Sequence, residues 1–349
     1  MKKLFGVFKC ALLLAALSLF LLPAPGFGAL GQELGDGFYL LDSSVDPESS
    51  VVVVKLTPGE MTKALTDVTR GEKLQEITRL LYTKFADDWD FLFFTNFTSQ
   101  VNEGNQHWRR LYDTVDGLGY PKDEKGYGAI SYGSPSKLKG YAFLSSAWSF
   151  VDGTTLHEIA HQYAAYIVST HGFVGTTVLA HWGVSNAGGR LGGFKYSRIV
   201  EENVGGALGK TKYQVSLWPE REPNGITFAH PGFYHSHNNV PYSDIELYLM
   251  GLISPQELRN KSFNLDIYTD AEQTFDQMVE GMFTATTKIS YSIDDLIARA
   301  GPRTPDASAS QKHFKALTLM LVDDSVPVDY ATMTDILKWF SGPITDTTY

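Results

Sequence analysis

The sequence predicts an α+β protein, and two observations lead to that prediction. Short β-branched or aromatic runs come first along the chain, whereas patterns of helical period dominate later. Strands and helices that are segregated in this way are typical of the α+β class, because a parallel α/β sheet requires them to alternate. The chain has 349 residues, which is enough to build a full apolar core.

The early elements follow from local patterns. Residues 50–56 (SVVVVKL) and 90–97 (DFLFFTNF) are apolar runs, and both predict strands. Between them, apolar residues recur at three and four along 71–88, which predicts an amphipathic helix. Residues 141–150 (YAFLSSAWSF) predict another strand, which we place at the edge of the sheet.

Helical patterns dominate the second half of the chain. They occupy residues 154–168, 242–258, 292–301, 311–322 and 330–340. The order of elements predicts a β-rich mixed-sheet lobe over about 29–150 and a mainly helical lobe over about 243–349. The helix at 154–168 lies between the two lobes, and no linker divides residues 29–349 into separate domains.

The first 28 residues have the layout of a secretory signal peptide. Three lysines precede an apolar run from Ala11 to Leu22, and prolines and small residues end it. The run is shorter than the roughly 20 residues that span a bilayer, so we expect cleavage after Gly28 rather than an uncleaved anchor. The expected product is secreted or periplasmic, with no stable membrane insertion.

Charge and cysteine content narrow the class of protein further. Removal of the leader, with its three lysines and no acidic residue, changes the net charge from −10 to −13. An acidic surface argues against nucleic acid and against anionic lipid as partners. The single cysteine, Cys10, lies in the leader, so the mature chain has neither a disulfide nor a thiolate ligand or nucleophile.

The stretch TTLHEIAHQYAAYIV, residues 154–168, carries an H-E-x-x-H motif. His157 and His161 are four apart, so a helix places them on one face, where both can reach one zinc ion. Glu158 stands beside the first histidine and can accept a proton from water. The motif thus predicts Zn²⁺ bound by His157 and His161, with Glu158 as the catalytic base.

A structural interpretation of the same motif is also possible. Thr155 and Glu158 have the spacing of a capping box, in which the glutamate only closes the start of the helix. His157 and His161 would then be core histidines. The position of the motif on a helix inside an exported chain favours the metal site.

A catalytic zinc site needs a third protein ligand. The motif does not continue as in a metzincin, because Ala164 and Ile167 replace the glycine and the third histidine. A thermolysin-like glutamate is also absent about twenty residues on, where His181 occurs instead. His181 is our first choice and Glu246 the second, although Ser243 and Glu246 also fit a capping box. The remaining candidates are Glu201, Glu202, His230, His235, His237 and Asp244.

Three segments together resemble a known group. LHEIAH, AHWGVSNAGGRLGGF and YSDIELYLMGLISP, within about residues 90–255, resemble uncharacterised bacterial exported proteins of the zincin type. The resemblance implies a zincin-like fold and zinc peptidase ancestry for His157, Glu158 and His161. It matches His181 and Glu246 as well, without deciding which of them binds metal.

The sequence therefore predicts an exported zinc-dependent endopeptidase that acts on a peptide or protein substrate. Candidate donors to the oxyanion are Tyr242, Tyr248 and any of His181 and the histidines at 230–237 that does not bind the metal. The strand at 141–146 is the candidate substrate edge. The main alternative is a non-catalytic exported binding or adhesion module with a structural or vestigial metal site. A metal-dependent hydrolase acting on other bonds would use the same ligands.

Overall fold

The computed structural model describes most of the chain between Gln32 and Ser325. The described residues are 32–40, 51–66, 70–96, 106–119, 128–144, 150, 154–164, 167, 181–204, 209–216, 241–268, 270–272 and 281–325. The predicted signal peptide and the helix predicted at 330–340 lie outside these ranges. The chain divides into two compact units, Met1–Asp113 with Gly126–Thr155 and His313–Tyr349, and Thr114–Lys125 with Leu156–Lys312.

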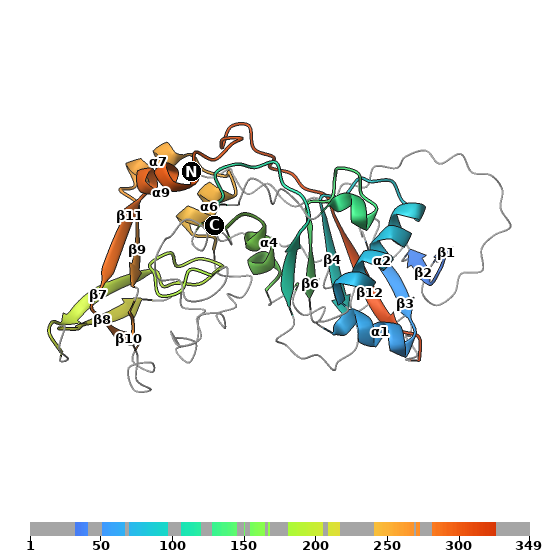
Figure 1. Cartoon of the computed structure of the whole chain (residues 1–349), viewed down its shortest axis with the longest axis horizontal. Helices are drawn as coiled ribbons and strands as arrows, with labels where there is room; N and C mark the ends of the chain where they lie inside the picture. The colour runs from blue at the N-terminus through green and yellow to red at the C-terminus, as the bar shows by residue number, and fades with distance from the viewer. Residues whose placement is uncertain are drawn as a thin grey trace. The chain divides into compact units, whose positions relative to one another are not determined.

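The first unit contains a seven-stranded mixed sheet (Figure 1). In spatial order its strands are β1 (Gln32–Gly35), β2 (Phe38–Leu40), β3 (Val51–Leu56), β12 (Ala316–Asp323), β4 (Phe91–Asn96), β6 (Gly140–Leu144) and β5 (His107–Arg110). The four strands β3, β12, β4 and β6 run parallel, and the strands on either side of them pair antiparallel. The α+β class and the mixed sheet are thus confirmed.

The central strands are buried on both faces. All six residues of β4 are buried, and so are Val51 to Val54 of β3. A strand covered on both faces reads as a continuous apolar run rather than an alternating one, which is why these two segments were recognisable in the sequence.

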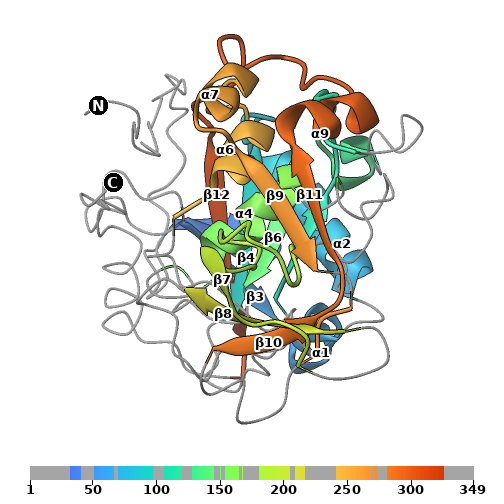
Figure 2. The ribbon, with the colours of Figure 1, turned by 90° about the vertical axis from the view of Figure 1, so that its left-hand side faces the viewer.

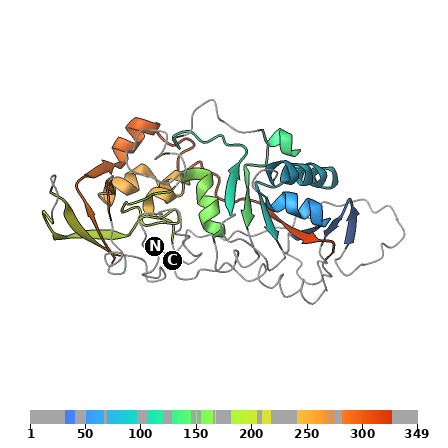
Figure 3. The ribbon, with the colours of Figure 1, turned by 60° about the horizontal axis from the view of Figure 1, so that its bottom comes forward.

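Two helices pack on one face of this sheet, α1 (Pro58–Leu65) and α2 (Arg70–Lys84), as Figure 3 shows. Thr57 caps α1 in a capping box with Glu60, and proline occupies its first turn. The apolar residues of the helix predicted over 71–88 pack against the sheet. Leu74, Ile77 and Leu81 are fully buried, and Leu80 and Phe85 are partly buried. The short 3₁₀ helix η3 (Ala129–Tyr132) packs next to α2.

Residues 311–322 do not form the predicted helix. Residues 316–323 are strand β12, which lies between β3 and β4 and pairs parallel with both. The run LTLMLV is apolar at every position but one, so its spacing fits a helix and a doubly buried strand equally well. Because this segment pairs between β3 and β4, it forms a strand and not a helix.

The second unit contains the remaining elements. The helices are α4 (Thr155–Ala164), α6 (Asp244–Leu249), α7 (Pro255–Asn260) and α9 (Ile293–Ala300), and α4 belongs to this unit from Leu156 onward. The strands are β7 (Tyr196–Glu201), β8 (Thr211–Ser216), β9 (Asn264–Tyr268), β10 (Met282–Ala285) and β11 (Lys288–Ser292). Strands β10, β8 and β7 form one antiparallel sheet, and β9 pairs with β11. Figure 2 shows α7 and α9 at one end of the β9–β11 ribbon. Up to Ser325, the described part of the lobe predicted over 243–349 contains strands β9 to β12 as well as helices, so this part is not mainly helical.

Two further predictions need correction. The strand at 141–144, β6, is not at the edge of the sheet, because β5 pairs along its outer side. The helix expected over residues 242–258 is divided into α6 and α7, and Gly251 adopts a left-handed φ of +74° where α6 ends.

Among the described residues, no helix combines the length and the apolar character that crossing a bilayer requires.

Candidate metal centre

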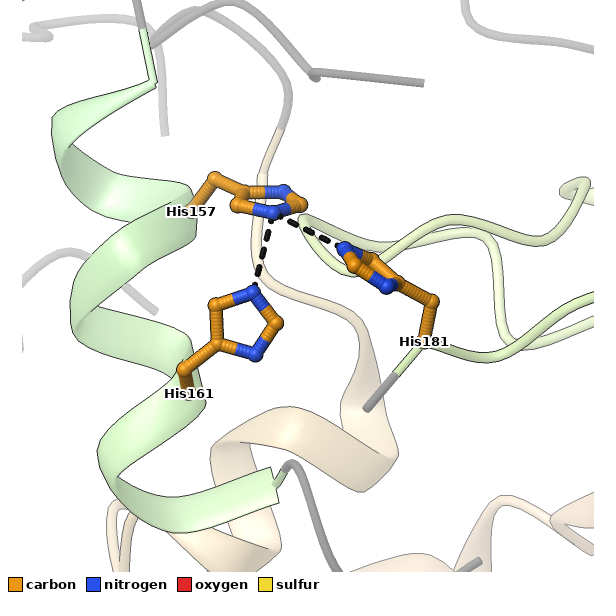
Figure 4. Close-up of side chains that lie close together, drawn as sticks. All are labelled: His157, His161 and His181. Carbon is orange, nitrogen blue, oxygen red and sulfur yellow. Dashed lines mark hydrogen bonds between the residues drawn. The ribbon is translucent and has the colours of Figure 1, made fainter. Parts of the chain in front are cut away.

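Helix α4 presents two histidines from successive turns. His157 and His161 lie on the same face, and their Nε2 atoms are 3.1 Å apart (Figure 4). The helix is held in place by buried apolar side chains, among them Ile159 and Ala160. The sequence prediction that one helical turn brings these two imidazoles together is therefore correct in geometry.

The third histidine comes from the loop segment that begins at residue 181. The Nε2 atom of His181 lies 3.1 Å from Nε2 of His157, and Figure 4 shows the three rings turned toward one another. The ring centroids are 4.8, 5.0 and 4.9 Å apart in the three pairs. One ligand atom from each histidine lies within 4.8 Å of the others, so this group could hold a metal ion.

A backbone carbonyl sets the tautomer of His157. Its Nδ1 lies 2.6 Å from the carbonyl oxygen of Arg190, and because a carbonyl only accepts, Nδ1 must carry the proton. In the neutral imidazole this leaves Nε2 unprotonated, and Nε2 faces the other two rings. Metal-binding histidines are commonly oriented in this way by a hydrogen bond from their other nitrogen.

The donor set fits zinc. Two imidazole nitrogens that bind one tetrahedral zinc at about 2.0–2.1 Å lie roughly 3.3 Å apart, and two of the three nitrogen pairs here are 3.1 Å apart. Imidazole nitrogen also suits copper, iron and nickel. His157 is buried, whereas His161 and His181 are half-buried.

Glu158 is a buried carboxylic acid next to the first histidine. Its side chain is 3 % exposed, and its Oε2 atom has no hydrogen-bond partner among the described residues. Burial raises the pKa of Glu158 to about 8. A positive ion nearby would favour the carboxylate and lower that pKa.

Glu246, the second choice for the third ligand, is committed elsewhere. It is fully buried, and its two carboxylate oxygens accept hydrogen bonds from four nitrogens. The donors are Trp182 Nε1 (3.0 Å), Arg190 N (2.9 Å), Leu191 N (2.8 Å) and Ser243 N (2.8 Å). Among the residues that the structure describes, the group that could hold a metal ion contains His181 and not Glu246.

The other candidates that the structure describes lie outside the histidine group. Glu201 and Glu202 are exposed at the end of β7. Asp244 forms an ion pair with Lys261. His230, His235 and His237 fall outside the described residues.

The two tyrosines named as oxyanion donors are hydrogen-bonded to backbone. The hydroxyl of Tyr242 donates to the carbonyl of Leu156 at 2.8 Å, which ties residue 242 to the start of α4. The hydroxyl of Tyr248 accepts from Arg303 N at 3.3 Å. Burial raises the pKa of both phenols, so each stays protonated at neutral pH.

Sequence reasoning missed the part played by Trp182 and Arg190. The one available signal was the pair of double glycines at 188–189 and 192–193, which predicts close backbone approach. The structure confirms that approach, because Gly189 and Gly192 exchange backbone hydrogen bonds and a Cβ at residue 189 would overlap the Glu246 carboxylate.

Comparison with protein-family models, with curated proteins and with solved structures found no match for this chain.

Proposed function

We propose that this chain is an exported zinc-dependent endopeptidase with a zincin-like fold. In this proposal His157, His161 and His181 hold Zn²⁺, and Glu158 is the general base. The observation that carries it is the convergence of three imidazole nitrogens beside a buried glutamate on the same helix. Catalytic zinc sites use three protein ligands and keep one position open for water or substrate, which suits a group of three histidines.

A zinc ion in this position supplies Lewis-acid chemistry, because it polarises a carbonyl group and makes water a better nucleophile at neutral pH. Glu158 accepts the proton of the attacking water on its carboxylate and returns it to the leaving amine. That role requires the ionised carboxylate, whereas burial alone raises the pKa to about 8. A cation held by the three histidines would favour the ionised carboxylate of Glu158.

The alternative is an exported binding or adhesion module that keeps the metal for stability. Structural zinc sites usually have four protein ligands, and the described residues provide three at this site. Glu158 is buried, and its Oε2 atom has no hydrogen-bond partner among those residues, so the structure gives this oxygen no structural purpose. Both observations favour catalysis over a structural metal.

The test measures metal content and cleavage of casein and of peptide libraries for wild type and for Glu158→Gln. We expect about one zinc per chain in both proteins and cleavage about 10²–10⁴-fold slower in the variant. Glu257→Gln, which changes a glutamate at the start of α7, is the matched control and should cleave like wild type.

Equal cleavage by wild type and Glu158→Gln would overturn the role of Glu158. Bound zinc without cleavage of any peptide would instead favour the binding module, unless a screen of ester and other amide substrates found Glu158-dependent hydrolysis. That last result would identify a hydrolase of a different substrate class.

A further inference from the structure

We infer that Glu246 is a positioning residue of the metal centre, which holds the backbone carrying His181 and the carbonyl that orients His157. The inference rests on the proposed zinc site and deepens it. It starts from the number and the origin of the hydrogen bonds that the Glu246 carboxylate accepts.

A capping glutamate needs only local partners. Glu257 is the comparison, because it occupies the third position of α7 just as Glu246 does in α6. Glu257 accepts from the backbone N–H and the hydroxyl of Ser254, three residues away. Glu246 also accepts from the backbone of its own cap residue, Ser243. Its other three donors, however, are 55, 56 and 64 residues away.

Those distant donors lead to two of the three histidines. Oε1 of Glu246 accepts from the indole of Trp182, the residue that follows His181. The backbone N–H of Trp182 in turn donates to the carbonyl of Leu191 at 2.9 Å, and Leu191 N also donates to Glu246. The segment that begins with His181 is thus fixed against residues 190–191 through one carboxylate.

The second path runs through the peptide units on either side of Arg190. Its N–H donates to Oε2 of Glu246, and its carbonyl oxygen accepts from Nδ1 of His157. Arg190 therefore connects the Glu246 carboxylate to the hydrogen bond that fixes the tautomer of His157. Loss of the anchor would free this carbonyl and, with it, the orientation of the first ligand.

Glycine at residue 189 makes this arrangement possible. A Cβ there would overlap Oε2 and the carboxylate carbon of Glu246, and it would also meet the hydroxyl of Ser243. The backbone preceding Arg190 therefore approaches the carboxylate as closely as it does only because residue 189 has no side chain.

The test compares metal binding by the full chain and by Glu246→Gln, with Glu257→Gln as the matched control. Glutamine has nearly the same shape, but its amide NH₂ group would face N–H donors instead of accepting from them. We expect about 10–100-fold weaker Zn²⁺ binding for Glu246→Gln by competition titration. The d–d absorption bands of the Co²⁺-loaded variant should also shift, while Glu257→Gln should match wild type in both readouts.

Trp182→Phe is the second variant, because it removes one donor and keeps the carboxylate, and it decides the question if Glu246→Gln does not fold. It should weaken Zn²⁺ binding by a few-fold and alter the Co²⁺ bands. Wild-type affinity and wild-type bands in a folded Glu246→Gln chain, or in Trp182→Phe if the former is unfolded, would overturn the inference and leave the zinc site standing. Absence of Zn²⁺ and Co²⁺ binding by wild type would instead overturn the proposed zinc site itself.

Discussion

The core of the first unit and the surroundings of α4 in the second differ in what they bury. The sheet of the first unit encloses side chains such as Phe94 and Leu319, which need only a shape that fits. Around α4, by contrast, His157, Glu158 and Glu246 are at most 3 % exposed. Buried polar groups are tolerated only when specific partners satisfy them.

The apolar core of the first unit mainly stabilises the fold, whereas the buried polar groups around α4 are candidates for chemistry. Burial of apolar surface stabilises the first unit, and such a core tolerates exchanges between apolar side chains of similar volume. In the second unit, the carboxylate of Glu246 accepts hydrogen bonds from four N–H donors. Glu158 is also buried, and burial raises its pKa. Perturbed groups of this kind gather where proteins bind metals or catalyse reactions. The predictions below contrast the two regions.

The largest effect is expected from His161→Ala. The variant removes one of three proposed ligands, so Zn²⁺ affinity should fall by more than the roughly 10–100-fold typical of outer-shell changes. Peptide cleavage should fall to background. Competition titration measures the affinity, and His313→Ala, a change at an exposed histidine before β12, is the control. An affinity equal to wild type would remove His161 from the site.

Phe94→Ala probes the apolar region. Phe94 is fully buried in β4, so truncation should lower the free energy of unfolding by about 3–5 kcal/mol. Urea denaturation of the metal-free chain measures the change. Zn²⁺ affinity of the folded variant should stay at the wild-type value, and a loss comparable to that of His161→Ala would contradict the separation of the two regions.

The pH dependence of stability probes Glu158. Burial raises its pKa to about 8 in the folded chain, above the ordinary value of 4.5. Between these values the unfolded chain loses the proton first, so the free energy of unfolding falls as pH rises through this window. At about 1.4 kcal/mol per pH unit, the fall between pH 4.5 and 7 is on the order of 3 kcal/mol.

The measurement is the difference between denaturation curves of metal-free wild type and Glu158→Gln at several pH values. Because glutamine does not titrate, the difference isolates Glu158 from other groups. A difference that does not change with pH would contradict a raised pKa at this residue.

The smallest effect is expected from Ser254→Ala at the start of α7. Ser254 accepts a hydrogen bond from Glu257 N at 3.2 Å, so its loss should destabilise the chain by about 0.5–2 kcal/mol. Zn²⁺ affinity should not change. Thermal denaturation and titration test the two statements, and weaker zinc binding would show that local caps in this unit are coupled to the centre.

The sequence identified elements whose pattern is local. Strands β3 and β4, helix α2 and the turn of α4 with His157 and His161 were all recognisable from spacing alone. The strand at 316–323 was not, because an apolar run buried between two neighbours has no period that distinguishes it from a helix. The place of β6 inside the sheet was also hidden, since β5 is a short and mostly polar strand.

The candidate metal centre likewise has parts that a local sequence pattern indicates and parts that depend on the tertiary fold. Ligand chemistry selected His181, but no local pattern required a residue twenty positions after His161 to approach it. Glu246 fitted both a ligand and a cap, and only its contacts with Trp182, Arg190 and Leu191 distinguish a third role. Contacts between residues 55–64 positions apart depend on the tertiary fold, which spacing along the chain does not encode.

The most direct test is X-ray absorption at the zinc edge of the zinc-loaded chain. We predict three imidazole nitrogens and one further light atom at about 2.0–2.1 Å. The imidazole count should fall to two in His181→Ala and stay at three in Glu246→Gln. Fewer than three imidazoles in wild type, or a wild-type count of imidazoles in His181→Ala, would contradict the assignment of the centre.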